Sequence, residues 1–202
     1  MPSEKNIFNA VSGIYGKFFD FQIGYFNKIT ERAQPEFDVS KFNSVLDVGC
    51  GTGALSHVLA DRGLKVVGVD PSEGMLKQAR EKIRNKDIEL MRIIPGEPLP
   101  FQDNSFDFAI SSYVAHGLKP EARKFFYAEM KRVAAEYVII HDYNQKRALH
   151  TTIIEWLEGG DYFNFIRTAA DELRTVFDEV RVADVDKRAA WYICSVVPKS
   201  SR

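Results

Sequence analysis

The feature that most constrains the fold of this chain is a glycine-rich segment, Ser44–Gly53, with the sequence S-V-L-D-V-G-C-G-T-G. Its first half is a short apolar run of the kind that forms a buried strand. Three glycines then stand at alternate positions: Gly49, Gly51 and Gly53. The apolar spacing after them predicts a helix. A strand, a glycine turn and a helix in this order are typical of α/β sheets that bind nucleotide-like ligands.

The residue types in this segment have physical reasons to be there. Glycine tolerates positive φ, and its missing side chain lets a ligand lie against bare backbone. Asp47 interrupts the apolar strand, and a buried carboxylate is costly unless it is hydrogen-bonded or meets a cation. The spacing is G-x-G-x-G, which differs from the G-x-G-x-x-G of dinucleotide binders. No Gly-Lys-Ser/Thr follows, which argues against a phosphate-cradling P-loop.

The second half of the expected ligand site lies further along the chain. The segment Lys65–Val69 reads as the next strand, and Asp70 follows at its end. A carboxylate at the end of this strand can accept hydrogen bonds from both hydroxyls of a ribose. The sequence therefore predicts that Asp70 and the glycine turn face one ligand.

Three segments of the chain together resemble the class I S-adenosylmethionine-dependent methyltransferases of the methyltransferase type 11-like family. They read V-L-D-V-G-C-G-T-G, V-V-G-V-D-P-S-E-G-M-L and L-P-F-Q-D-N-S-F-D, and the resemblance covers about residues 42–142. It implies an α/β fold: a Rossmann-like, seven-stranded, mostly parallel sheet whose last strand is antiparallel, with helices on both faces. It also implies S-adenosylmethionine as the cofactor and methyl transfer as the activity.

The resemblance implies roles for several residues toward the cofactor. The backbone of the glycine turn, including Cys50, is expected to approach the methionine and ribose parts. Asp47 is expected to orient the methionine amino group through water, and Asp70 to accept the ribose hydroxyls. Ser111 and Tyr113 are expected near the methionine end. The alternatives are a structural hydrogen bond for Asp47 and a helix-capping role for Asp70.

Adenine recognition is where this sequence departs from the family. In close relatives the segment after the third strand usually begins G-D-A-E, and its Asp binds the adenine amino group. Here Pro95 stands at that position, and its side chain cannot make that contact. We expect Pro71 and Met75 to flank the adenine ring, and the backbone around Gly96 and Glu97 to replace the missing contact.

The first 35 residues are rich in aromatic side chains at helical spacing. They predict one or two helices, which in the family often lie over the cofactor and substrate cleft. Tyr15 and Phe19 are then expected to belong to a lid, with Tyr15 near the cofactor. The alternative is that the aromatic face packs on the sheet.

No fixed catalytic motif is present in the sequence. Transfer of a methyl group to oxygen or nitrogen often needs a base. His116 and His141 follow strand ends that face the same edge of the expected sheet, and an imidazole can shuttle a proton near neutral pH. The alternative for each is a hydrogen-bonded structural histidine. No Cys/His cluster has the spacing of metal ligands, so we expect no metal site.

The length of 202 residues suits one methyltransferase domain over residues 1–202. Within it we expect N-terminal lid helices at 1–35, a cofactor-binding core at 42–143, a small helical cap at 145–176 and a C-terminal strand hairpin at 177–198.

Charge, hydropathy and cysteine content limit which partners and which cellular location we expect. The formal net charge is −1, which gives no reason to expect nucleic acid. We find no signal peptide and no apolar run near 18 residues, so we expect no membrane partner and a cytoplasmic location. Cys50 and Cys194 suit reduced thiols. We expect a monomer or a homodimer.

The sequence thus predicts an S-adenosylmethionine-dependent methyltransferase acting on a small-molecule acceptor, with oxygen, nitrogen, sulfur and carbon all open as the methylated atom. One alternative is a non-catalytic protein that binds S-adenosylmethionine or S-adenosylhomocysteine. Another is a nicotinamide-dependent oxidoreductase on a similar sheet. The G-x-G-x-G spacing and the L-P-F-Q-D-N-S-F-D segment argue against the oxidoreductase.

Overall fold

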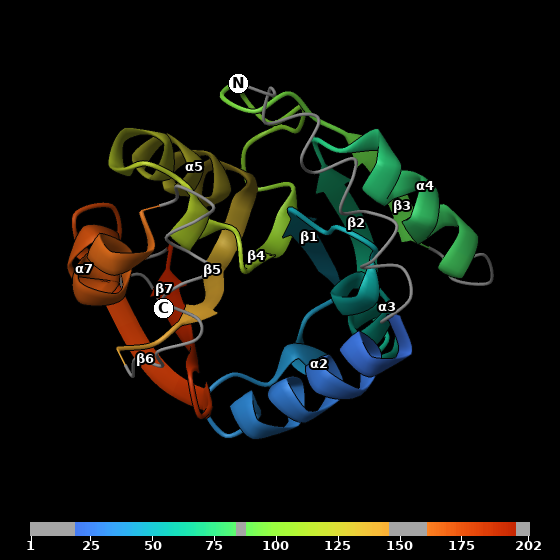
Figure 1. The fold of residues 1–202 in the computed structure, drawn as a ribbon, viewed down its shortest axis with the longest axis horizontal. Helices are drawn as coiled ribbons and strands as arrows, with labels where there is room; N and C mark the ends of the chain where they lie inside the picture. The colour runs from blue at the N-terminus through green and yellow to red at the C-terminus, as the bar shows by residue number, and fades with distance from the viewer. Residues whose placement is uncertain (1–18, 84–87, 146–160, 197–202) are drawn as a thin grey trace.

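A computed structural model describes residues 19–83, 88–145 and 161–196 of the chain. Over these ranges the chain forms a seven-stranded sheet flanked by helices (Figure 1). The expected position of Tyr15, and most of the first half of the expected cap, fall outside the described residues. The strands are β1 (Ser44–Val48), β2 (Lys65–Asp70), β3 (Ile88–Arg92), β4 (Phe106–Ser112), β5 (Ala134–Tyr143), β6 (Glu179–Asp186) and β7 (Ala189–Ser195).

The strand order is β3-β2-β1-β4-β5-β7-β6. The pairs from β3 through β5 are parallel, and β7 runs antiparallel to both β5 and β6. The predicted Rossmann-like sheet with an antiparallel last strand is therefore confirmed. Chain order reverses between β1 and β4, which creates the switch point beside which open α/β sheets bind their ligands.

Helices cover both faces of this sheet. The first face carries α2 (Phe19–Ala33) and α3 (Ala54–Asp61), whose buried side chains pack with residues such as Val45, Ile139 and Trp191. In Figure 1, α2 lies beneath α3 and reaches the end of β6, which it also contacts. The second face carries α5 (Pro120–Val133) and α7 (Tyr162–Arg174), whereas α4 (Glu73–Lys82) follows β2.

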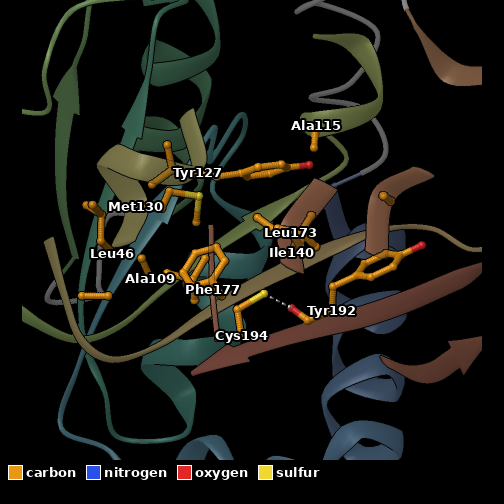
Figure 2. Packing of buried hydrophobic residues seen from close by; sticks show 14 of the residues in the cluster. Leu46, Ala109, Ala115, Tyr127, Met130, Ile140, Leu173, Phe177, Tyr192 and Cys194 are labelled. Atoms are coloured by element: carbon orange, nitrogen blue, oxygen red, sulfur yellow. Dashed lines mark hydrogen bonds between the residues drawn. The ribbon is translucent and has the colours of Figure 1, made fainter. Parts of the chain in front are cut away.

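The alternation of strand side chains divides the core into these two layers. Leu46, Ala109 and Ile140 point to the α5 and α7 face, and their neighbours in sequence point to the other face. Figure 2 shows the α5 and α7 layer, in which Tyr127 and Met130 from α5 approach Leu173 and strand residues. Each strand side chain therefore packs in one of the two layers, and two consecutive side chains at a strand end point to opposite faces of the sheet.

Local signals explain most helix boundaries. Gly53 precedes α3 with a φ of 78°, and Gly63 follows it with a φ of 89°. Ser72 caps α4 by accepting a hydrogen bond from the Met75 amide at 3.3 Å, and Pro120 is the first residue of α5. These three helices were predicted from the sequence within a few residues of their observed bounds.

Two details of α5 and β5 differ from the sequence pattern. The sequence pattern itself favours a helix from Pro120 to about Ala135 and a strand over Tyr137–Ile140. In the structure α5 ends at Val133 and β5 begins directly after it, at Ala134. Helix-favouring residues give way here because Ala134 pairs with Phe106 of β4. Phe125 was expected to point inward, but 39% of its surface is exposed.

One buried arginine joins the two helices of the second face. The Arg123 guanidinium of α5 is fully buried and donates to Glu172 of α7 at 2.8 and 2.9 Å. It also donates to Asp161 at 2.8 Å and to the carbonyl of Leu118. The Phe165 ring lies 5.6 Å from the guanidinium carbon. Arg123 therefore fixes the start and the last turn of α7 against α5.

Side-chain hydrogen bonds join β1 and β4 at the amino-terminal ends of these strands. Asp107 accepts hydrogen bonds from the amides of Asn43 at 2.7 Å and Ser44 at 2.9 Å. In return, the Ser44 hydroxyl accepts from the Asp107 amide at 3.0 Å. This reciprocal contact holds the two central strands at the edge opposite the expected ligand site.

Candidate functional site

The glycine turn between β1 and α3 has the conformation that only glycine adopts easily. Gly49, Gly51 and Gly53 all have positive φ, at 80°, 55° and 78°. The amides of Gly49 and Cys50 both donate to the carbonyl of Val69, at 2.8 and 3.0 Å. These bonds tie the turn to the end of β2.

The three glycines face different surroundings. A methyl group added to Gly49 would lie 2.4 Å from Val114 Cγ2, and one added to Gly53 would lie 3.3 Å from Ala79 Cβ. The same group on Gly51 would meet nothing within 4 Å. Gly51 is therefore the point where bare backbone faces open space, which is what a ligand lying on the turn requires.

Asp70 lies beside this opening, at the carboxyl end of β2. Its side chain is mostly buried, and its two oxygens accept from the Gly51 amide at 2.9 Å and the Ser72 amide at 2.8 Å. Burial raises the pKa of Asp70, and the two amide bonds counter that effect. Because each carboxylate oxygen can accept more than one hydrogen bond, the pair can still receive two ligand hydroxyls.

Asp47 carries an unmatched polar atom under the turn. Its residue is 1% exposed, and Oδ2 accepts from the Ser56 hydroxyl at 2.6 Å. No described residue donates to Oδ1. Burial raises the pKa of this carboxyl to about 7. A cationic group reaching Oδ1 directly or through water would relieve this cost.

The other predicted cofactor residues near the turn differ in exposure. The Cys50 thiol is buried under Gly68, where an added methyl group would lie 3.0 Å from the sulfur. Met75 is mostly buried and Pro71 is exposed. Cys50 therefore presents its backbone to the turn, whereas its side chain belongs to the core.

The predicted adenine turn is exposed. Gly96 and Glu97 lie in a tight turn after β3, with a φ of 82° at Gly96. The Glu97 amide donates to the carbonyl of Ile94 at 3.2 Å. This bond occupies the amide that we expected to help recognise adenine, so the Glu97 contact stays a prediction.

The two predicted base candidates lie on opposite faces of the sheet. His141 and Asp142 are consecutive in β5, so their side chains point to opposite faces. His141 points to the α2 face. Asp142 points to the α5 and α7 face, where it contacts His116.

His141 is sealed beneath α2. Its residue is 1% exposed, and its ring stacks on Tyr25 at 5.9 Å and meets the edge of Phe26 at 5.9 Å. Nδ1 lies 3.1 Å from the Ser112 hydroxyl, and Nε2 lies 3.4 Å from the Tyr25 hydroxyl. Burial lowers the pKa of His141 to about 4, so the ring is neutral at pH 7.

His116 forms an imidazole–carboxylate pair with Asp142. Its Nδ1 lies 2.8 Å from Asp142 Oδ1, and the His116 amide also donates to Oδ2 at 3.2 Å. The Tyr143 amide donates to Oδ1 at 2.8 Å. A carboxylate only accepts, so Nδ1 of His116 carries a proton in this contact. Asp142 itself is fully buried.

Aromatic rings surround this pair. The ring centroids of four side chains lie between 4.8 and 6.5 Å from that of His116; they belong to Tyr113, Tyr143, Tyr162 and Phe165. Ser111, one residue before the end of β4, is also buried, and its hydroxyl has no partner among the described residues. The site is therefore a polar pair in a largely aromatic setting.

Tyr113 lies between the two clusters. Its ring is 4.9 Å from that of His141 and 5.2 Å from that of Tyr143. Its hydroxyl lies 2.6 Å from the Tyr25 hydroxyl. The next residue, Val114, covers Gly49. One short segment after β4 thus touches the glycine turn and both histidine clusters.

Three contributors to the site were missed from the sequence or ranked too low. Ser56 could have been found, because it lies on the first turns of the helix after the glycine turn. Asp142 stands beside His141 in the sequence, but strand alternation turns it to the opposite face, where it contacts His116. Tyr25 had no local signal, since its partners are 88 and 116 residues away.

Two kinds of feature are absent from the described ranges of the chain. No group of three or more His, Cys, Asp or Glu side chains there could hold a metal ion. No helix among them is long and apolar enough to cross a membrane.

Comparison with known proteins gives three kinds of match. A family model described as a methyltransferase domain matches residues 46–139. A malonyl-[acyl-carrier protein] O-methyltransferase of Geobacter sulfurreducens is 38% identical over 94 residues, which are 46% of this chain and 34% of that protein. A demethylmenaquinone methyltransferase of Listeria welshimeri is 45% identical over 75 residues, 35% of this chain and 32% of that protein. The chain thus spans about a third of these two relatives.

Longer matches have lower identity. An uncharacterised methyltransferase of Staphylococcus carnosus is 24% identical over 175 residues, 85% of this chain and 80% of that protein. Among solved structures, a SAM-dependent methyltransferase from Aquifex aeolicus has a TM-score of 0.63 at 24% identity and covers 87% of this chain and 98% of that one. A putative S-adenosyl-L-methionine-dependent methyltransferase from Methanococcus maripaludis has a TM-score of 0.67 at 17% identity, covering 95% and 94%. The structural matches show a shared fold.

Proposed function

The chain belongs to the class I S-adenosylmethionine-dependent methyltransferases, and on that premise we propose that it methylates an O–H or N–H group of a flat or apolar small molecule. The observation that carries this proposal is the His116–Asp142 pair at the carboxyl end of the sheet, beside the segment that covers the glycine turn. A base at this place is needed for acceptors that must lose a proton.

The residues present fit S-adenosylmethionine. Gly51 offers open backbone, and Asp70 offers two carboxylate oxygens beside it for the ribose hydroxyls. The unmatched Oδ1 of Asp47 suits the cationic methionine amino group. When bound, this cofactor supplies an electrophilic methyl group on a positively charged sulfur.

In the proposed mechanism His116 accepts the acceptor's proton at Nε2. Asp142 then stabilises the imidazolium that forms, and its hydrogen bonds from two backbone amides keep it in place. The aromatic side chains around His116 exclude water and orient a flat acceptor, which aligns the acceptor's nucleophilic atom. We assign His141 to support of the site, because its ring is neutral and covered by α2.

The named relatives do not identify the acceptor of this chain. One relative is named for malonyl-[acyl-carrier protein] and another for demethylmenaquinone, and the chain covers only a third of each. We therefore take the acceptor's class from the aromatic side chains of this chain. The monomeric or homodimeric state, the absence of a nucleic-acid partner and the division into lid, core, cap and hairpin stay predictions.

Cofactor binding is tested by calorimetric titration of S-adenosylmethionine into wild type, Gly51→Ala and Gly63→Ala. Both glycines have positive φ and open space at Cβ, so both variants carry similar backbone strain. We expect Gly51→Ala alone to weaken binding by about tenfold or more, since its methyl group occupies the ligand's place. Equal binding by all three proteins would remove the glycine turn from the site.

Catalysis is tested by an acceptor screen with radiolabelled S-adenosylmethionine, followed by His116→Gln on any acceptor found. We expect His116→Gln to lower kcat by about a hundredfold or more while cofactor affinity stays unchanged. An unchanged kcat would exclude His116 as the base. Saturable cofactor binding with no turnover across flat O–H and N–H acceptors would favour the alternative of a non-catalytic binding protein.

A further inference from the structure

We propose that Tyr25 of α2 is a positioning residue for methyl transfer: through its hydroxyl it fixes Tyr113 between the glycine turn and the His116–Asp142 pair. This inference rests on the proposed function and deepens it, because it makes α2 part of the site. Tyr113 would contact the ligands, whereas Tyr25 acts through Tyr113. The hydroxyl contact between them, at 2.6 Å, is the observation from which the inference starts.

Tyr113 needs something to hold it. Its φ is 54°, a left-handed conformation that is unfavourable for a bulky residue. Its amide donates to the carbonyl of His141 at 2.9 Å, which anchors the backbone to β5. This bond leaves the direction of the side chain to be set by other contacts.

A chain of four polar groups sets that direction. It runs from the Tyr113 hydroxyl to the Tyr25 hydroxyl, on to His141 Nε2, and from Nδ1 to the Ser112 hydroxyl, with distances of 2.6, 3.4 and 3.1 Å. A neutral imidazole donates a hydrogen bond from one ring nitrogen and accepts one at the other. All hydrogen bonds along this row of polar groups therefore point the same way. When the Ser112 hydroxyl donates to His141 Nδ1, Nε2 donates to the Tyr25 hydroxyl, and Tyr25 donates to the Tyr113 hydroxyl. The proton of the Tyr113 hydroxyl is then available to a group outside this row.

The outward end of this chain lies where both ligands are expected. Val114, the next residue, covers Gly49 of the glycine turn. The Tyr113 ring also lies 5.2 Å from Tyr143 and 6.4 Å from His116. A fixed hydroxyl at this boundary can donate to an acceptor oxygen of either ligand, and a displaced ring would disturb both sides at once.

Other contacts hold α2 in place without Tyr25. Gln22 accepts from the Thr52 hydroxyl at 3.0 Å, and Arg32 donates to Asp186 at 2.7 Å. Phe26 and Ile29 of the same helix are buried in the core. Removing only the Tyr25 hydroxyl should therefore leave α2 docked and break the polar chain alone.

The test uses Tyr25→Phe, Tyr113→Phe, the double variant and Tyr127→Phe as a matched control. The control also loses a buried tyrosine hydroxyl, but one with no partner among the described residues. Each protein is titrated with S-adenosylhomocysteine and melted. We expect each single variant of the chain to weaken binding by about fivefold, the double variant to be no weaker than Tyr113→Phe, and the control to bind like wild type.

Two outcomes would overturn the inference. One is a Tyr25→Phe protein that binds within twofold of wild type; the other is a double variant whose losses multiply, since independent residues give additive free energies. If Tyr25→Phe does not fold, Ser112→Ala removes the far end of the chain and carries the same expectation. A wild type that does not bind S-adenosylhomocysteine contradicts the proposed function itself, whereas equal binding by wild type and Tyr25→Phe contradicts this inference alone.

Discussion

Among single residues, Asp47 is the one whose burial makes stability depend most clearly on pH. Its carboxyl is buried, one oxygen has no partner among the described residues, and its pKa is raised to about 7. The folded protein therefore holds this proton more tightly than the unfolded chain does, in which an Asp ionises near pH 4. The free energy of unfolding consequently falls as the pH rises from about 4 to about 7.

We expect Asp47→Asn to remove this fall. The variant keeps an oxygen that can accept from Ser56, so its free energy of unfolding at pH 8 should exceed that of wild type by up to about 4 kcal/mol, or about 1.4 kcal/mol for each unit by which the Asp47 pKa is raised. The difference should vanish near pH 4. Urea unfolding at both pH values measures it, and calorimetry should show weaker S-adenosylmethionine binding. Parallel pH profiles for the two proteins would show that Asp47 is not the titrating group.

Residue-level features could be predicted where the cause is local. Asp47 and Asp70 stand out in the sequence because each breaks or ends an apolar run. The contact between Tyr25 and Tyr113 could not be predicted, because 88 residues separate them and neither interrupts a pattern. His141 and Asp142 point to opposite faces because both lie in β5, and His116 contacts Asp142. That His116 and His141 lie apart therefore follows only once the bounds of β5 are known.

At the scale of elements, α5 and α7 depend on one buried charge. Arg123 has no exposed side-chain surface, whereas its partners Asp161 and Glu172 are 17% and 28% exposed. A buried guanidinium is stable only with its full set of hydrogen bonds, so these carboxylates and α7 must be in place together. The carboxylate pairs also favour its charged form and raise the pKa of Arg123, against the effect of burial.

We expect Arg123→Ala to lower the free energy of unfolding by about 3 kcal/mol. Arg174→Ala is the matched control, because Arg174 pairs with Asp171 on the exposed surface of α7, and its loss should cost less than about 0.5 kcal/mol. Both substitutions place alanine in a helix, so helix propensity affects both alike. Thermal unfolding compares them, and equal losses would mean that the buried pairs contribute no more than the exposed one.

The bounds of helices and strands could be predicted well where apolar residues form a clear run or where a capping residue is present. The bounds of β1, β2 and β4 follow from apolar runs, and those of α4 follow from its cap. The junction of α5 and β5 failed because Ala134 and Ala135 favour a helix in isolation, and only pairing with β4 makes them strand.

For the molecule as a whole, the reactivity of the two cysteines reports whether the glycine turn and the α5 and α7 layer open together. Cys50 lies at the glycine turn, and Cys194 lies within β7 on the α5 and α7 face. Both are free thiols, and burial raises the pKa of each, which disfavours the reactive thiolate. Each thiol can therefore react only when its surroundings open.

We expect a thiol-reactive dye to label both cysteines at rates set by the same opening free energy, as in a single cooperative unit. The variants Cys50→Ser and Cys194→Ser assign each rate. Faster labelling of Cys50 in the native protein would instead mean that the glycine turn opens by itself. Addition of S-adenosylmethionine should slow any such local opening.

The opposite directions of His141 and Asp142 have a consequence for how this enzyme could be re-engineered or could diversify. The polar chain beneath α2 and the aromatic setting of His116 share β5 but use different faces of it. Under the proposed function, a library at Tyr162 and Phe165 of α7 would change the rings around His116 while every residue of the glycine turn and of α2 stays as it is. If that proposal holds, we expect acceptor specificity to change in such a library while binding of S-adenosylmethionine is retained.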